Sequence, residues 1–402
     1  MNIPDVIFLL SMTLLVQWEA LKTCKRNPAI SRLYPYIAVG IILWVFYSFW
    51  AESVTTNLFN VPISDAMVHD LNAKEISSLI DNEGFFNVLK QYEWRLGNPA
   101  YALFVGIIYN LTGTSYISIY LFNGLMAAWG GIILLNIISK TMGLQRVSRW
   151  ILLITVFFPS TIFWATSNSK EGLMFWAICM SLNIVRFKKE KVAVSTLIGF
   201  VVALLTMIVF RPHIAIIWIG AILMVSFVKE GKRRYAVPAF IFFVISLKAA
   251  SDYTGGWLIE KSTVEVLEEH YEIQKKWKKG STVIDDSDKP LPFLDGFAMM
   301  FIRPYIWEIN SIKYAATAFE TWGVLLIMIY SWTTARRQRM RLMRNNQLVM
   351  LAGIVLVLFA FFFSFQGNLG LIARYKLQAV PAILILINVP LLRKQNYRNK
   401  LH

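Results

Sequence analysis

Residues 115–138 read SYISIYLFNGLMAAWGGIILLNII, a stretch without a charged side chain that is long enough to cross a membrane as a helix. A helix satisfies its backbone hydrogen bonds within one segment, which the interior of a bilayer requires. Similar apolar runs recur at 4–21, 35–51, 148–165, 171–187, 192–210, 213–229, 234–250, 314–334, 347–365 and 377–393. The sequence therefore predicts an all-α membrane protein with about eleven transmembrane helices.

The composition supports a membrane protein and argues against a nucleic-acid partner. Hydrophobic residues make up 56% of the 402 residues and charged residues 16%, whereas a soluble domain has about a quarter charged residues. The formal net charge is +16, but Lys and Arg occur in short clusters between the apolar runs. Such clusters mark the cytoplasmic loops of membrane proteins. We therefore expect membrane lipids around the chain and no bound nucleic acid.

The basic clusters also predict an orientation. They fall in every second loop, at 22–34, 139–147, 186–191, 229–234, 335–346 and 393–402. This pattern places the N-terminus outside and the C-terminus in the cytoplasm of a multi-pass protein of the inner, cytoplasmic membrane. Residues 98–112 are apolar but short, and a crossing there would move every later basic loop to the wrong side. We therefore expect an amphipathic helix at the outer surface over 98–112.

The same alternation organises the chain into modules. Residues 1–250 form a predicted N-terminal transmembrane module, and its first outer loop is 52–114. Residues 251–313 are charged and mixed in composition, which is typical of an outer loop subdomain or lid. Residues 314–402 form the predicted C-terminal transmembrane helices.

Ionisable residues gather near the predicted outer boundary, although they come from well-separated segments. They are Asp65, His69, Asp70, Lys170, Glu171, Arg211, His213, Arg303, Glu308, Arg374 and Lys376. Charged groups beside hydrocarbon carry a desolvation cost and are therefore candidates for function. A Lys or Arg at a helix end commonly reaches the lipid head groups instead. Here these cations lie on the outer side, against the charge bias, and beside proline or glycine turns.

The stretch 62–75, PISDAMVHDLNAKE, carries the first of these groups. At helical spacing Asp65 and His69 share one face, and Asp70 lies beside them. A carboxylate on such a helix can act as general base for a hydroxyl nucleophile. The alternative is a solvated helix with ordinary charges, and the other outer charges favour the functional interpretation.

Several cations with a few carboxylates suit a substrate that bears phosphate and has a hydroxyl partner. Arg contacts phosphate oxygens in pairs, and Lys provides a point charge. The predicted catalytic residues are Asp65, His69, Asp70 and Glu171. The predicted substrate-binding residues are Lys170, Arg211, His213, Arg303, Glu308, Arg374 and Lys376. No cofactor is firmly implied, and a divalent metal has no supporting ligand motif in the sequence.

Residues 35–215 resemble the GT-C glycosyltransferases, multispan enzymes that use a polyprenyl-phosphate sugar as donor. The resemblance rests on an outer-loop Asp65 followed by Ala73, on NPAY at 98–101, on LTGTS at 111–115, on LFNGLMAAWGGIILLNIIS at 121–139, and on FPSTIFWATSNSKEG at 158–172. It implies that Asp65 is the catalytic base and that the turn with Lys170 and Glu171 is the second acidic site.

The chain also departs from this family. His69 stands where an aromatic residue is common in the family. The motifs FIRPYIWE and GNLGLIARYK in the C-terminal third look more like membrane proteins of polysaccharide gene clusters.

The expected function is transfer of a sugar or oligosaccharide from a polyprenyl-phosphate or diphosphate carrier to a glycan or lipid-linked acceptor on the outer face. One alternative is an O-antigen or capsule repeat-unit polymerase. Another is a non-enzymatic flippase or transporter, which should carry polar groups near the bilayer midplane and paired broken helices.

The predicted orientation can be tested by cysteine labelling in intact cells. A cysteine replacing Gly280 should react with an impermeant thiol reagent, because 251–313 is predicted to lie outside. A cysteine replacing Gln338, in the basic loop 335–346, should stay unlabelled until the membrane is opened. The reverse pattern would contradict the predicted side for every candidate residue named above.

Overall fold

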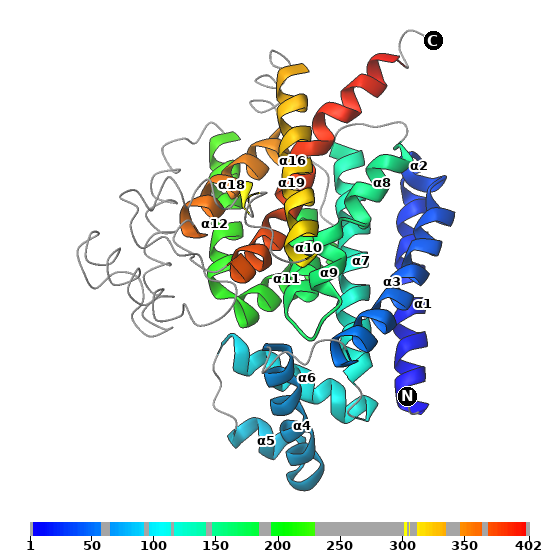
Figure 1. Ribbon diagram of the computed structural model, residues 1–402, viewed down its shortest axis with the longest axis vertical. Helices are drawn as coiled ribbons and strands as arrows, with labels where there is room; N and C mark the ends of the chain where they lie inside the picture. Colours follow the sequence, from blue (N-terminus) through cyan, green and yellow to red (C-terminus); the bar gives the residue numbers. More distant parts are fainter. Residues whose placement is uncertain are drawn as a thin grey trace, which may run out of the picture. The chain divides into compact units, whose positions relative to one another are not determined.

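The computed structural model describes residues 3–57, 65–91, 96–113, 116–141, 147–184, 194–229, 301–303, 305, 312–334, 346–363 and 369–398. Within these ranges all regular elements are helices, which confirms the all-α prediction (Figure 1). The predicted span 234–250, the segment 251–298 and Glu308 lie outside the described residues. The chain divides into two compact units, Met1–Pro212 and His213–His402, and each is described by itself.

The helix boundaries follow the apolar runs of the sequence. The helices of the first unit are α1 (Ile3–Arg26), α2 (Pro28–Ser31), α3 (Tyr34–Asn57), α4 (Asp65–Glu83), α5 (Phe85–Gln91), α6 (Asn98–Thr112), α7 (Tyr116–Thr141), α8 (Arg149–Val156), α9 (Pro159–Ala165), α10 (Glu171–Ser181), the 3-10 helix η1 (Leu182–Ile184) and α11 (Val194–Phe210). Those of the second unit are α12 (Pro212–Lys229), α16 (Ile312–Thr334), α18 (Gln347–Phe363) and α19 (Leu369–Arg398), with α12 beginning at the boundary.

Three of the described helices could cross a membrane by length and composition, namely Ile3–Arg26, Tyr34–Ser53 and Tyr116–Thr141. Shorter apolar helices follow at Arg149–Ala165, Glu171–Ile184, Val194–Phe210, Pro212–Val225, Ala318–Tyr330 and Gln347–Ala360. These helices indicate a membrane-associated protein. The larger number of spans and the orientation stay predictions.

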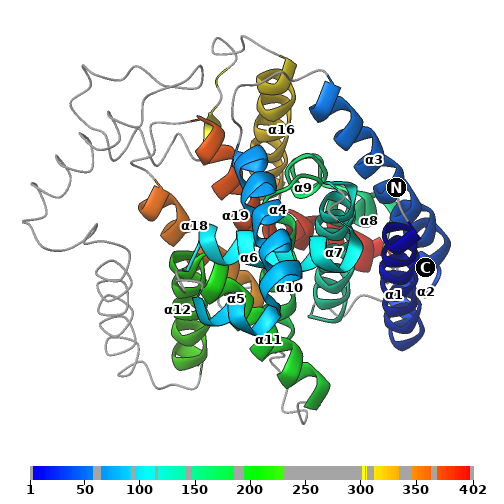
Figure 2. The same cartoon turned by 90° about the horizontal axis from the view of Figure 1, so that it is seen from below.

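Helix α7 is the central helix of the first unit, and 83% of the residues in its most apolar stretch are buried. It packs against α1, α3, α8, α9 and α10, as both views of the fold show (Figures 1 and 2). By contrast, α1 exposes large apolar side chains, among them Leu10, Leu14 and Trp18. Apolar residues on an outward face suit lipid rather than water, so the burial pattern agrees with a helix at the edge of a membrane bundle.

The predicted span 148–165 is interrupted, which the sequence analysis did not expect. It forms α8 and α9, with Phe157 and Phe158 outside the helices. Phe158 adopts extended backbone angles, φ −63° and ψ 124°. Pro159 explains the break, because proline lacks an N–H donor and disfavours helical geometry in the residue before it.

Helices α4 and α6 cross closely in the first unit (Figure 1). A Cβ atom on Gly106 of α6 would lie 2.7 Å from Ile76 Cγ2 and 3.1 Å from the Ala73 carbonyl oxygen of α4. Glycine at position 106 therefore sets how near the two helices approach.

The helix predicted over 98–112 is confirmed as α6, and its depth in the membrane stays a prediction.

The second unit is built on α19, which packs against both α16 and α18. Its described helix begins at Leu369 and ends at Arg398, so it is longer than the predicted span 377–393. Arg374 and Tyr375 therefore belong to a helix, whereas the sequence predicted that the outer cations, Arg374 among them, lie beside proline or glycine turns.

Replacing Gly106 by alanine should destabilise the first unit. The new methyl group would overlap Ile76 near its backbone, and such overpacking costs about 1–3 kcal/mol. Gly199→Ala is a matched control, because its Cβ would meet only the flexible tip of Met180, with Met180 Cε at 2.8 Å. Both variants gain the same helix propensity. Thermal unfolding in detergent should show a lower Tm for Gly106→Ala than for Gly199→Ala, and equal values would contradict the close α4–α6 crossing.

Candidate functional site

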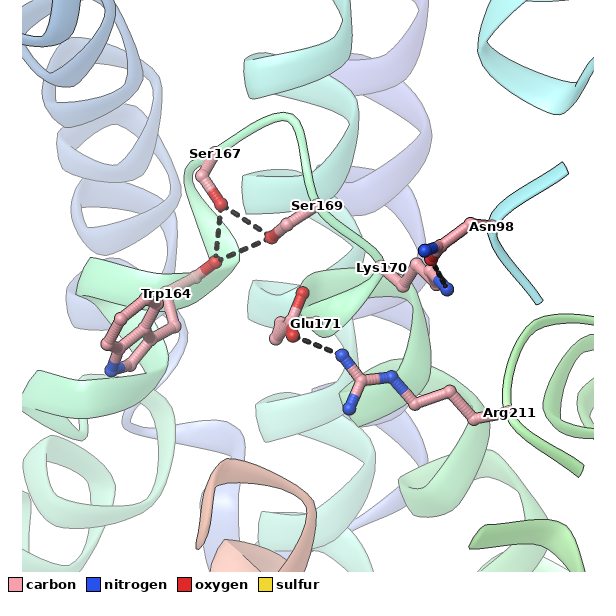
Figure 3. Close-up of polar contacts among 7 residues, drawn as sticks. All are labelled: Asn98, Trp164, Ser167, Ser169, Lys170, Glu171 and Arg211. Carbon is pink, nitrogen blue, oxygen red and sulfur yellow. Dashed lines mark hydrogen bonds and ion pairs between the residues drawn. The ribbon is translucent and has the colours of Figure 1, made fainter. Parts of the chain in front are cut away.

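The candidate site of the first unit is built around the turn from Thr166 to Lys170, which joins α9 to α10 (Figure 3). The hydroxyls of Ser167 and Ser169 both donate to the Trp164 carbonyl oxygen, at 2.8 and 3.2 Å. The last carbonyl groups of a helix have no partner within the helix, and short polar side chains commonly satisfy them. These bonds fold the turn back on the end of α9 and so position Lys170 and Glu171.

Gly172 lets the start of α10 lie directly against α7. A Cβ atom on Gly172 would collide with the Asn123 carbonyl oxygen and would also approach the Ala165 carbonyl oxygen at 3.1 Å. Only glycine leaves room for this contact between backbones. Glu171, the residue before it, is consequently buried, with 1% of its surface exposed.

Glu171 forms a buried ion pair with Arg211 (Figure 3). Arg211 directly follows α11 and is 9% exposed. Glu171 is the first residue of α10, so the carboxylate lies at a helix N-terminus and the guanidinium at a helix C-terminus. Both positions are favourable for these charges, because the helix dipole is positive at its N-terminal end and negative at its C-terminal end. The pair thus offsets the desolvation that burial imposes on each charge.

Lys170 connects the same turn to the start of α6. Its ammonium group donates to the side-chain oxygen of Asn98, the first residue of α6 (Figure 3). The preceding Gly97 has φ +92°, a conformation that favours glycine, and its N–H donates to the Val209 carbonyl oxygen at 2.8 Å. The start of α6, the end of α11 and the start of α10 therefore meet at one polar junction.

Tyr101 of α6 contacts several parts of this junction. Its hydroxyl accepts from Asn123 Nδ2 at 3.0 Å and donates to Asn168 Oδ1 at 3.3 Å. The edge contacts of its ring join it to His69, with centroids 5.0 Å apart, and to Phe210, at 5.8 Å. Burial raises the pKa of Tyr101 far above its ordinary value, so the hydroxyl stays protonated and able to donate.

The two acidic groups predicted on α4 differ in surroundings. Asp70 is buried and accepts a hydrogen bond from the Tyr109 hydroxyl at 2.7 Å, and its other oxygen pairs with Lys74 at 2.8 Å. Asp65 is the first residue of α4. The next residue, Ala66, accepts from Asn168 Nδ2 at 3.2 Å through its carbonyl oxygen, which brings the start of α4 to the turn before α10.

The second unit contains the remaining described candidates. Lys376 donates to the Arg303 carbonyl oxygen and lies 3.4 Å from Thr321 Oγ1. Arg303 is buried and lies over the Tyr305 ring at 5.2 Å. Burial lowers the pKa of Lys376, which precedes the predicted span 377–393, to about 7, and Glu320 opposes this shift.

His213 and Arg374 are the last of the described candidate residues in the second unit. The His213 ring meets Tyr375 edge to face, with centroids 6.0 Å apart. Arg374 lies half-buried on α19. The structure thus gathers Lys170, Glu171 and Arg211 with the start of α4 in one unit, and it brings Arg303 to Lys376 in the other.

Three asparagines belong to this site although the sequence analysis did not include them among the site residues, namely Asn98, Asn123 and Asn168. Asn123 and Asn168 are both fully buried. Their signal in the sequence is an amide group inside or beside an apolar run, where an unsatisfied polar group is costly. Among the described residues, no group of three or more His, Cys, Asp and Glu side chains could hold a metal ion.

An apolar groove of about 410 Å³ lies between α3 and the broken helix α8–α9. It is lined by Leu43, Trp44, Phe46, Tyr47, Trp50, Phe157 and Ile162. The Tyr47 hydroxyl forms a hydrogen bond with the side chain of Thr166, where the polar turn begins. An apolar surface thus adjoins the charged junction within the first unit.

Comparisons of the chain with protein-family models, with curated proteins and with solved structures found no match. The function is therefore argued from the chemistry of the site.

The ion pair can be tested through stability. Arg211→Met removes the guanidinium but keeps much of its hydrocarbon, so Glu171 loses this partner in a buried setting. Loss of one member of a buried pair costs about 3–5 kcal/mol. The double change Arg211→Met with Glu171→Gln should recover much of the loss, because no buried carboxylate remains.

The pair Glu19–Lys22 is the control for this experiment. Its side chains are 25% and 40% exposed, and such surface pairs contribute about 0–1 kcal/mol. Lys22→Met should therefore leave the unfolding midpoint in detergent almost unchanged. An equally small effect of Arg211→Met would contradict the buried pair.

Proposed function

We propose that the protein is an integral membrane glycosyltransferase of the GT-C type. It transfers a sugar or oligosaccharide from a polyprenyl-phosphate or diphosphate carrier to a hydroxyl of a glycan or lipid-linked acceptor on the outer face. The observation that carries the proposal is the junction of Lys170, Glu171 and Arg211 with the start of α4. Ionisable groups in an apolar helical protein are costly, and function is the usual reason for keeping them.

The cations of the junction suit the phosphate of the donor. A guanidinium has five N–H donors in a fixed plane, and this geometry suits paired contacts with phosphate oxygens. Arg211 forms its ion pair with Glu171 at this junction. Lys170 adds a second positive charge from the adjoining turn. As the glycosidic bond to phosphate breaks, the leaving group takes the bonding electrons, and these cations stabilise the negative charge that develops on it.

The apolar groove beside the junction supports a lipid-linked substrate. Its seven lining residues are aliphatic or aromatic, and the Tyr47 hydroxyl among them forms a hydrogen bond with Thr166, where the polar turn begins. Its volume lies within the range of about 300–1,000 Å³ that is common for ligand sites. A hydrocarbon chain in the groove and a phosphate at Lys170 would place both halves of one amphiphile on matching surfaces.

The acceptor hydroxyl needs a base, and Asp65 is the better of the two candidates on α4. The carboxylate of Asp70 already binds Tyr109 and Lys74, which gives it a role in holding α4 to α6. Asp65 begins the helix one turn before His69. In the proposed step it takes the hydroxyl proton as the acceptor oxygen bonds to the sugar carbon and the phosphate departs.

The number of transmembrane helices and their orientation are part of the same proposal. About eleven transmembrane helices with the N-terminus outside and a cytoplasmic C-terminus would place this junction on the outer face. The basic loops of the sequence and the apolar helices support this arrangement.

Two alternatives remain. The break between α8 and α9 favours a flippase or transporter, because transporters commonly use discontinuous helices at their binding sites. A repeat-unit polymerase would use the same chemistry with a larger donor. The surface glycans of cells with and without the gene distinguish a polymerase from a single-sugar transferase. Ladders that collapse to one repeat indicate a polymerase, whereas loss of one side-branch sugar indicates a single-sugar transferase.

Asp65→Asn should abolish the product while leaving the protein folded. The substitution keeps the shape of the side chain and removes the base, which typically contributes about 10²–10⁴-fold to the rate. The measurement is the surface glycan of gene-deleted cells that express each variant at equal membrane level. His69→Ala should cost less, because the expected role of His69 is to orient the carboxylate or the sugar.

Asp70→Asn is the control at the second carboxylate. It should lower the Tm, because it weakens the contacts to Tyr109 and Lys74, but it should retain glycan production per folded protein. Normal production by Asp65→Asn would contradict the assignment of the base. If Asp70→Asn alone abolished production at normal stability, the base would be Asp70.

A further inference from the structure

A chain of buried hydrogen bonds runs from α7 to the start of α4. Asn123 Nδ2 donates to the Tyr101 hydroxyl at 3.0 Å and to the Ser167 carbonyl oxygen at 2.9 Å. The Tyr101 hydroxyl donates to Asn168 Oδ1 at 3.3 Å, and Asn168 Nδ2 donates to the Ala66 carbonyl oxygen at 3.2 Å. Asn123, Tyr101 and Asn168 are each 0% exposed, and the two bonds of the Tyr101 hydroxyl are shielded from water, whereas the bonds to Ser167 and Ala66 are partly buried.

Each bond in this chain has a defined direction. The Tyr101 hydroxyl accepts from one amide and donates to the other, which uses its single proton. Asn168 then accepts through its oxygen and donates through its nitrogen, so the bond to Ala66 depends on the bond to Tyr101 for the orientation of the amide. A carbonyl oxygen has two lone pairs, and Ala66 can therefore accept from Asn168 without losing a bond within α4.

We propose that Asn168, oriented by Tyr101, is a positioning residue that holds the first turn of α4 against the turn carrying Lys170 and Glu171. The proposal rests on the proposed function in one respect: the contact affects the reaction only if Asp65, the residue beside Ala66, is the base. A base on the first turn of a helix depends on contacts with other segments to fix its place, because that turn lacks a preceding turn of helix. The contact to Asn168 supplies it.

The pair Asn110–Asp81 provides a matched comparison. Asn110 Nδ2 of α6 donates to Asp81 Oδ1 of α4 at 2.6 Å, near the other end of α4 and on the surface. Both asparagines therefore tether α4 through one hydrogen bond. If tethering α4 were the whole role of Asn168, the two substitutions to alanine should affect glycan production alike.

A spin label on α4 tests the contact without any substrate. Met67 and Leu79 are exposed, at 48% and 37%, so a cysteine at either position can carry the label. Asn168→Ala should free the first turn of α4 and so narrow the EPR lines of the label at 67. The EPR lines of the label at 79 should stay unchanged. Asn110→Ala should narrow the spectrum of the label at 79 and leave that of the label at 67 unchanged. An unchanged spectrum at 67 in Asn168→Ala would overturn the proposal.

Function is measured in the same variants through the surface glycan of gene-deleted cells at equal membrane level. Asn168→Ala should reduce the rate of glycan production by about ten- to a hundredfold, because small misplacements of a catalytic group cost that much. Asn110→Ala should keep the normal rate. Equal rates in the two variants would overturn the positioning role.

Two conservative variants separate positioning from folding. Tyr101→Phe keeps the ring contacts to His69 and Phe210 but removes the hydroxyl that orients Asn168. Asn168→Asp can still accept from Tyr101 but cannot donate to Ala66. Tyr101→Phe loses buried hydrogen bonds and Asn168→Asp buries a carboxylate, so both variants should lower the Tm. Both should also mobilise the label at 67 and lower glycan production per folded protein. A normal rate per folded protein in both would contradict the proposal.

The failure of this inference differs from the failure of the proposed function. If the gene changes no surface glycan, the transferase proposal fails, while a mobilised label at 67 in Asn168→Ala still supports the contact that positions α4. If the glycan depends on the gene and on Asp65 but not on Asn168, the transferase proposal stands and the positioning role is wrong.

Discussion

A charge can be buried in this apolar helical protein only beside a partner, and the pair Glu171–Arg211 meets that condition for the first unit. The carboxylate begins α10 and the guanidinium follows α11, so each lies at the helix end whose dipole favours it. The pair joins residues 40 positions apart in the chain. It therefore fixes the end of α11 relative to the start of α10, and the contacts of Lys170 and Gly97 build on that arrangement.

Close approach between backbones is the second condition for the site. Gly172 allows α10 to rest on the Asn123 carbonyl of α7, and Gly106 allows α6 to cross α4 at Ala73. With these helices near one another, a single tyrosine on α6 can reach two asparagines from different segments and the histidine ring on α4. Packing of small residues thus determines which polar groups meet, as is common where helices associate without water.

The sequence predicted the helices better than it predicted the contacts of the site. Apolar runs end where charges and turn residues begin, and for this reason α6 and α12 fall close to their expected boundaries. The break at Pro159 was overlooked because hydropathy does not register a missing N–H. The gathering of Lys170, Glu171 and Arg211 was expected because the basic loops predict that all three lie on the same side of the membrane. Which of them pair was not predicted. Glu171 pairs with Arg211, whereas Lys170, its neighbour in the sequence, donates to Asn98.

The two carboxylates at the start of α4 show why contacts, rather than residue types, assign a role. By sequence, Asp65 and Asp70 are both candidates for a base, and only the resemblance to the GT-C enzymes favours Asp65. In the structure Asp70 is bound on both oxygens, and the adjacent Asp70 carboxylate adds to burial in raising the pKa of Tyr109, so that tyrosine remains a donor. A carboxylate engaged in this way anchors its helix and has less freedom to accept a proton from a substrate. The Asp70 contact joins α4 to α6, and the Ala66 carbonyl joins its first turn to the turn before α10. Asp65 therefore begins a helix whose start lies beside the turn that carries Lys170, which is the position that the proposed transferase requires of its base.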